Sequence, residues 1–118
     1  MVTRASRPEY NLAEVKTATA ELKIEFRGRK PRLDVLNLDY ELNDVSLCLM
    51  QLLSSDYRKT IQYEDRLPDD EYICEFSKPG NKHLAADRLY IKFCNARFIF
   101  LKLFFLVESY ARLASAVG

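Results

Sequence analysis

The chain has 118 residues, of which 48% are hydrophobic and 30% are charged, and its formal net charge is +1. This length predicts one domain over residues 1–118 that buries a core without disulfides, and the composition excludes a disordered chain. The near-zero net charge excludes a surface uniformly adapted to nucleic acid, although basic residues dominate both ends of the sequence and acidic residues dominate residues 34–75.

The first half of the sequence has the periodicity of helices. Residues 1–10 form a basic segment that is expected to be flexible. After it, a capping pair of Asn11 and Glu14 and apolar residues at three- and four-residue spacing are typical of helices. Three helices are predicted, over residues 11–22, from the break at Gly28 and Pro31 to Asn37, and over residues 43–53.

The second half changes to the alternation of side chains that is typical of strands. Four strands are predicted, over residues 57–63, 72–76, 89–94 and 98–104. Turns are expected at Pro68–Asp70 and at Lys78–Asn81, and residues 106–118 are expected to form a helical tail. Helices followed by consecutive strands indicate an α+β domain in which N-terminal helices pack on a C-terminal antiparallel sheet.

The cysteines and the apolar runs indicate the compartment in which the protein is located. Cys48, Cys74 and Cys94 form no CxxC pair, and an odd number of cysteines without metal-ligand spacing favours buried core thiols in a reducing compartment. The most apolar run, residues 98–107, contains Lys102 and is too short to span a bilayer. We therefore expect a soluble, cytoplasmic protein without a secretory signal or a membrane contact.

The sequence lacks the familiar catalytic motifs. It contains no Gly-rich phosphate loop, no GxSxG elbow, no HExxH helix and no carboxylate set with metal-ligand spacing. His83 is the only histidine and lies in a polar stretch, where a solvated side chain is expected. No metal and no other cofactor are therefore expected.

Basic and phenolic residues on the predicted strands are the remaining candidates for chemistry. RNA can be cleaved without metal or histidine when its 2′-hydroxyl attacks the neighbouring phosphate. The enzyme then has to move two protons and stabilise the charge of the phosphorane. Clustered Lys, Arg and Tyr side chains can do this, and Tyr rings can stack on unpaired bases. Alternatively, these residues are only the outward side chains and packing groups of a half-exposed sheet.

Three stretches within residues 7–104 together resemble the motility quorum-sensing regulator (MqsR) family of bacterial toxins. They are Arg7-Pro-x-Tyr10-x-Leu12-x-x-x-Lys16, residues 38–60 with the run Asp56-Tyr-Arg-Lys59-Thr60, and Leu89-Tyr90-Ile91-Lys92-Phe93. The first is similar to the basic lead into that family's first helix. The second is similar to a helix followed by an Asp-aromatic-Tyr-Lys-Ser strand, and the third to an aromatic-aliphatic-Lys strand.

The resemblance implies a RelE-like fold and a ribosome-independent, metal-independent mRNA endoribonuclease. Such an enzyme is the toxin of a type II toxin–antitoxin pair, and its partners are mRNA and a cognate antitoxin protein. By position, Lys59 and Lys102 would stabilise the phosphate or the transition state, and Tyr90 would donate a proton or position the substrate. The residues expected to bind RNA are Tyr57, Arg58, Tyr63, Lys92 and Arg97. Replacing Lys59 with alanine is expected to abolish cleavage without changing the melting curve.

The sequence also departs from the family's pattern. It has no tryptophan, and Ile73 or Cys74 stands where the family has a glutamine. Acidic residues at positions 64–71 are expected to form a patch that repels phosphate. The alternative is therefore a catalytically weakened or inactive module of the same fold that binds a protein partner through the apolar run over residues 98–107. A third possibility, an interaction adaptor without an RNA role, rests on the low net charge.

Overall fold

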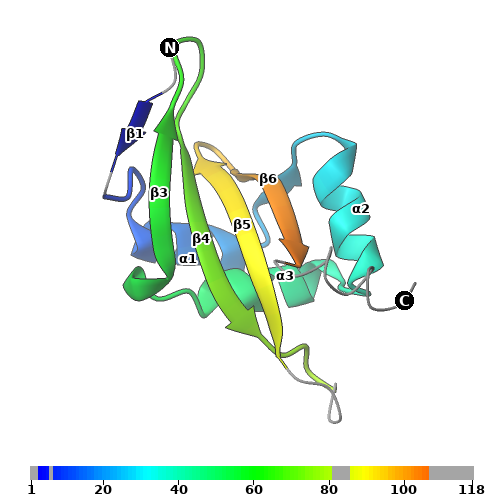
Figure 1. Ribbon diagram of the computed structural model, residues 1–118. Coiled ribbons are helices and arrows are strands. Elements are labelled where there is room, and N and C mark those ends of the chain that lie inside the picture. The colour runs from blue at the N-terminus through cyan, green and yellow to red at the C-terminus, as the bar shows by residue number, and fades with distance from the viewer. Residues whose placement is uncertain (1–2, 6, 81–85, 107–118) are drawn as a thin grey trace, which may run out of the picture.

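The structure, a computed structural model, describes residues 3–5, 7–80 and 86–106, and it describes only the backbone of residues 3–5 and 102–106. The chain order of its elements is shown in Figure 1. The elements are β1 (Thr3–Ala5), α1 (Leu12–Ala20), β2 (Ile24–Phe26), α2 (Arg29–Asn37), α3 (Leu42–Met50), the 3₁₀ turn η1 (Ser54–Asp56), β3 (Tyr57–Gln62), β4 (Asp69–Phe76), β5 (Asp87–Asn95) and β6 (Ile99–Leu106). No helix in these ranges is long and apolar enough to cross a membrane.

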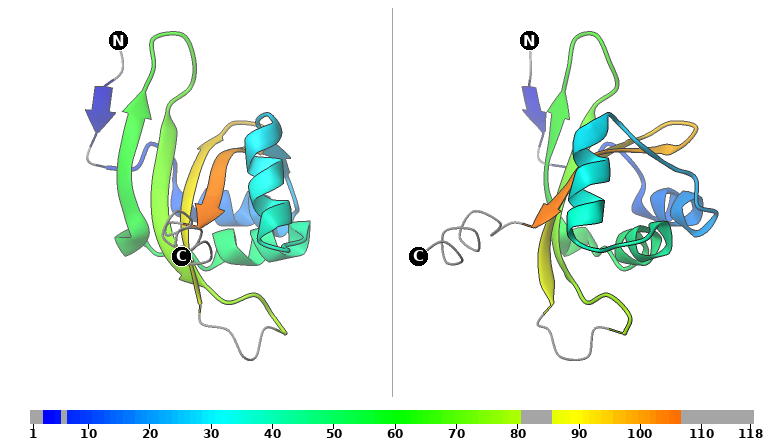
Figure 2. Two further views of the ribbon diagram at one scale, coloured as in Figure 1. Left: turned by 45° about the vertical axis from the view of Figure 1, so that its right-hand side comes forward. Right: turned by 90° about the vertical axis from the view of Figure 1, so that its right-hand side faces the viewer.

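The strands form one six-stranded sheet in the order β1-β3-β4-β5-β6-β2. All neighbouring strands are antiparallel except β2 and β6, which are parallel. The three helices lie on one face of this sheet, and the opposite face carries no helix from the described part of the chain (Figure 2). The protein therefore has the α+β fold that the sequence predicts, with two of its strands coming from the N-terminal part.

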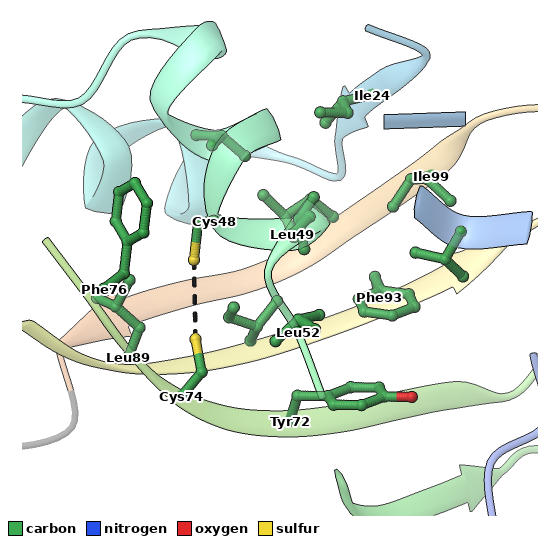
Figure 3. Packing of buried hydrophobic residues seen from close by; sticks show 14 of the residues in the cluster. Ile24, Cys48, Leu49, Leu52, Tyr72, Cys74, Phe76, Leu89, Phe93 and Ile99 are labelled. Carbon is green, nitrogen blue, oxygen red and sulfur yellow. Dashed lines mark hydrogen bonds between the residues drawn. The ribbon is translucent and has the colours of Figure 1, made fainter. Parts of the chain in front are cut away.

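The core fills the space between the helices and the sheet (Figure 3). From β4 and β5, the rings of Tyr72 and Phe93 stack with their centroids 5.6 Å apart. Leu49 of α3 packs within the same cluster and is fully buried. The sulfur atoms of Cys48 and Cys74 lie 3.7 Å apart inside this cluster, and all three cysteines are buried free thiols, as the sequence predicts.

The predicted helices and strands are confirmed, with their ends shifted by up to three residues. The predicted capping pair is also present, because the Asn11 side chain accepts a hydrogen bond from the Glu14 N–H at 3.1 Å. The prediction that residues 1–10 are flexible is wrong for β1, which pairs with β3. Most of the predicted helical tail, residues 107–118, lies outside the described residues.

The turn predicted at Pro68–Asp70 is also wrong, because β4 begins at Asp69. Asp70 is fully buried on the helix side of the sheet, where its carboxylate accepts hydrogen bonds from the Glu9 and Tyr10 N–H groups, each at 3.0 Å. It also accepts a hydrogen bond from the Thr60 hydroxyl. The Asp70 carboxylate thus fixes the segment before α1 to the sheet. The sequence does not predict this contact, because Pro-Asp-Asp has the composition of a turn.

Stability at alkaline pH is expected to depend on Tyr72. Burial raises the pKa of Tyr72 from 10.0 to about 12, and the charge of Asp70 adds to this effect. Between these two values the folded protein keeps a proton that the unfolded chain has lost, so stability is complete below pH 10 and falls as the pH rises towards 12. The loss is about 2–3 kcal/mol at most. Urea unfolding at several alkaline pH values measures it.

The variant Tyr72→Phe keeps the ring on Phe93 and removes the titrating hydroxyl. Its free energy of unfolding should therefore fall less steeply with pH than that of the parent protein. A slope equal to that of the parent protein would contradict the assignment of this titration to Tyr72.

Candidate functional site

The alternation of side chains along β4 and β5 divides their residues between the two faces of the sheet. Tyr72 and Phe93 point into the core, so their neighbours in the sequence point the other way. We call the face opposite the helices the helix-free face. The residues that β3, β4 and β5 place on it include Lys59, Glu71, Ile73, Tyr90 and Lys92.

Three of these residues form a row across the helix-free face. In the register of the sheet, Lys59 of β3 lies opposite Glu71 of β4, which lies opposite Lys92 of β5. The Glu71 side chain is 3% exposed, and its ion-pair partner in the described structure is Lys59, with Nζ and Oε2 3.5 Å apart. No hydrogen bond from a described residue reaches that oxygen. The row therefore has a buried carboxylate between two lysines.

Tyr90 lies next to this row. It precedes Lys92 by two residues on β5 and pairs with Ile73. Neighbouring strands are about 4.8 Å apart and residues rise by about 3.3 Å, so the Cα atoms of Lys59 and Lys92 are about 10 Å apart, with Tyr90 about 7 Å farther along β5. Two amines and a phenol on one face are thus within the span of one or two nucleotides.

Lys102 belongs to β6, the next strand. The register between β5 and β6 shifts at this point, with Leu103 opposite Lys92 and Leu101 opposite Phe93. Lys102 is therefore the extra residue of a bulge beside the row. Its side chain is outside the described part of the structure, so its role stays a prediction.

A hollow of about 550 Å³ lies beside the row, towards the β3–β4 loop. The residues that line it, which we call the cationic hollow, are Arg27, Tyr63, Arg66, Leu67, Asp69, Lys92 and Cys94. The Arg27 guanidinium lies 4.1 Å from the centroid of the Phe100 ring, and the Arg66 guanidinium lies 4.0 Å from that of the Tyr63 ring. Both arginines are therefore held against aromatic faces.

Tyr63 is fixed at the wall of the cationic hollow. Its hydroxyl donates a hydrogen bond to Asp69 Oδ2 at 2.8 Å. Burial raises the pKa of Tyr63 to about 12, and the hydrogen bond to Asp69 and the charge of that carboxylate act in the same direction. Tyr63 is therefore a neutral phenol at physiological pH, and Asp69 is oriented by it.

The expected acidic patch is not formed by the three acidic residues of β4. Asp69, Asp70 and Glu71 are all buried, with Asp70 on the helix side and Glu71 against Lys59. The row and the cationic hollow together hold Arg27, Lys59, Arg66 and Lys92 against the carboxylates of Asp69 and Glu71. Within this set four cations face two buried carboxylates, and the exposed Glu64 and Asp65 lie in the same loop as Arg66. The cations on this part of the helix-free face are groups that can bind phosphate.

Three predicted RNA-binding residues lie apart from this group. Tyr57 points to the helix side, where its ring meets the edge of Tyr72 with the centroids 5.7 Å apart. Arg58 lines a second hollow of about 450 Å³. Arg97 is exposed in the loop between β5 and β6. The structure thus brings Lys59, Tyr63, Tyr90 and Lys92 to one face, and Tyr57, Arg58 and Arg97 lie apart from this group.

Sequence reasoning missed Arg27 and Arg66 as site residues. Arg27 follows β2, and Gly28 with a φ of 86° turns the chain directly after it into α2. Its side chain reaches the hollow because β2 pairs with β6, more than 70 residues later in the chain. A basic residue next to a glycine break is the only signal in the sequence, and this signal does not reveal the pairing.

Comparison with known proteins does not assign the chain to a family, since neither protein-family models nor curated protein sequences match it significantly. The chemistry of the site therefore rests on its own groups. Guanidinium and ammonium groups bind phosphate, and neutral phenols donate hydrogen bonds and protons. No three side chains of metal-ligand type gather among the described residues, and His83 lies outside them.

Proposed function

We propose that the protein is a metal-independent endoribonuclease that cleaves mRNA. In this proposal it has a RelE-like fold and acts as the toxin of a type II toxin–antitoxin pair, neutralised by a cognate antitoxin protein. The observation that carries the proposal is the common placement of Lys59, Tyr90 and Lys92 on the helix-free face, beside a cationic hollow. The resemblance of the sequence to MqsR toxins assigns two of these residues to the same chemistry.

The reaction needs only the RNA and side chains. The 2′-hydroxyl loses its proton to solvent and its oxygen forms a bond to the adjacent phosphorus, while the bond from phosphorus to the 5′-oxygen breaks. Lys59, held by Glu71, stabilises the negative charge of the phosphorane, and Lys102 adds a second cation. Tyr90 gives its proton to the leaving 5′-oxygen. The products are a 2′,3′-cyclic phosphate and a 5′-hydroxyl.

A non-catalytic module of the same fold that binds a protein partner is the second candidate. One observation favours it. Ile73, which pairs with Tyr90, places an apolar side chain on the helix-free face, and it is one of the two residues, with Cys74, that can stand where the MqsR pattern has a glutamine. Such a module would retain the fold and lose the cleavage step, so the same experiment separates the two functions.

The experiment uses the purified chain and a synthetic single-stranded RNA in the presence of EDTA. We expect cleavage products that end in a 2′,3′-cyclic phosphate. A substrate with 2′-deoxyribose at the cleaved position should stay intact. Tyr90→Phe should lower the cleavage rate by about 100-fold, the contribution of one positioned proton donor.

Lys30→Ala is the matched control. Lys30 is also paired with a carboxylate, since its Nζ lies 3.2 Å from Asp34 Oδ1, but both residues belong to α2 on the helix side. Its removal should leave the rate unchanged. If folded protein at micromolar concentration leaves RNA intact, the nuclease is refuted and the binding module takes its place.

A further inference from the structure

The cationic hollow is built from segments that are far apart in the sequence. Arg27 follows β2 directly, Arg66 belongs to the β3–β4 loop, and Lys92 belongs to β5. The position of Arg27 is fixed by its backbone, because its N–H donates to the Leu101 carbonyl at 2.8 Å. The sheet thus brings three cationic side chains to one concave place.

The charges of the hollow are available to a ligand. Among the described residues, none of Arg27, Arg66 and Lys92 forms an ion pair with a carboxylate, in contrast to Lys59. Asp69 opposes them, but it is fully buried and accepts the hydrogen bond of Tyr63. An anion in the hollow would therefore lie towards the two guanidinium groups and the amine, away from Asp69.

Size and geometry indicate which anion fits. A volume of about 550 Å³ lies within the range of sites that hold small ligands, and it accommodates a nucleotide rather than a phosphate group alone. Planar guanidinium groups bind phosphate oxygens in pairs. Because Arg27 and Arg66 already lie against Phe100 and Tyr63, they lose little freedom when the anion binds.

We infer that the cationic hollow is a nucleotide subsite that holds an RNA phosphate next to the one that is cleaved. This inference rests on the proposed nuclease function for its substrate and extends it to Arg27 and Arg66, which lie outside the stretches that resemble the family. Lys92 connects the two places, since it belongs both to the hollow and to the row with Lys59. The subsite recognises the charge and the shape of the phosphate group, so it binds a nucleotide with any base.

The binding experiment does not depend on cleavage. Calorimetry with 5′-AMP, with pyrophosphate and with adenosine as the uncharged control measures the affinity of the folded protein. We expect 5′-AMP and pyrophosphate to bind and adenosine to fail. Arg27→Ala and Arg66→Ala should each weaken binding of 5′-AMP by tenfold or more.

Arg88→Ala is the matched control for both variants. Arg88 is an exposed arginine that lines the second hollow. Its replacement should leave the affinity for 5′-AMP unchanged. Thermal melting of all three variants verifies that they are folded at the temperature of the titration.

Cleavage kinetics then separate the subsite from the nuclease. If both are correct, Arg66→Ala raises the KM for RNA by about tenfold and leaves kcat near the parent value, because the interaction is made before the reaction and kept during it. If Arg27→Ala and Arg66→Ala weaken binding of 5′-AMP by tenfold or more but the parent protein does not cleave RNA, the subsite is supported and the nuclease is refuted. Cleavage with an unchanged KM in both variants refutes the subsite alone. Equal binding of 5′-AMP by all variants, or none at millimolar concentration, also overturns it.

Discussion

Lys59→Ala is expected to lower the free energy of unfolding by about 2 kcal/mol at neutral pH. Removing the lysine leaves the Glu71 carboxylate, which is 3% exposed, without its ion-pair partner in the described structure. Breaking a buried pair from one side is costly, because the remaining charge is neither solvated nor compensated. The value is below that of a fully buried pair because the Lys59 side chain is 33% exposed and the atoms are 3.5 Å apart. The variant should therefore melt below the parent protein, in contrast to the unchanged melting curve that the sequence alone predicts.

Urea unfolding of a double-mutant cycle tests this expectation. Glu71→Gln removes the buried charge, so Lys59→Ala in that background should cost less than about 1 kcal/mol. If Lys59→Ala has the same unfolding midpoint as the parent protein, the carboxylate does not depend on the lysine. RNA cleavage by Lys59→Ala should be measured at a temperature where the variant is still folded, so that lost activity reports on chemistry.

Asp70→Ala is expected to have the largest effect on stability, a loss of about 3–5 kcal/mol. The carboxylate is fully buried and accepts hydrogen bonds from the Glu9 and Tyr10 N–H groups and from the Thr60 hydroxyl. Its removal leaves the Glu9 and Tyr10 N–H groups without this acceptor, whereas the Thr60 hydroxyl can still donate to the Arg7 carbonyl at 3.1 Å. Each donor left unsatisfied in a buried place costs about 1–3 kcal/mol, and the space that the carboxylate filled is lost as packing. Thermal or urea unfolding gives the total loss.

Hydrogen exchange locates the effect of Asp70→Ala within the chain. The amides of Glu9 and Tyr10 should exchange much faster than in the parent protein, because they lose the carboxylate that they bind. Glu75→Ala serves as the control, since Glu75 lies on the same strand and is exposed. It should change stability by less than about 0.5 kcal/mol. Unchanged exchange at Glu9 and Tyr10 would contradict the anchoring role of Asp70.

The helices and the four central strands could be predicted because each contains enough residues to show a period. Alternation over β3 and β5, for example, assigns Lys59 and Lys92 to the outward side. β1 and β2 have three residues each, and three residues show no period. Their strand conformation depends on pairing with β3 and β6, which are far away in the sequence.

The candidate site could be predicted only where its residues belong to strands that are long enough to show alternation. Lys59, Tyr90 and Lys92 follow from alternation within single strands, and the structure places them on one face. Arg27 and Arg66 do not follow from alternation. Their positions depend on the strand order and on the path of the two connections that carry them, the β2–α2 connection and the β3–β4 loop. The burial of Glu71 was also hidden, since a carboxylate among polar residues gives no sign that a lysine from the next strand covers it.

The strand order has a consequence for how the chain folds as it is synthesised. β2 occupies its place at the edge of the sheet only when β6, the last described strand, is available to pair with it. Contacts of such large sequence separation form late, because closing the long intervening loop is entropically costly. Arg27 therefore joins Lys92 only after β6 has left the ribosome. A nascent chain that has exposed β3 and β5 but not β6 would have the row of Lys59, Glu71 and Lys92 but an unfinished nucleotide subsite.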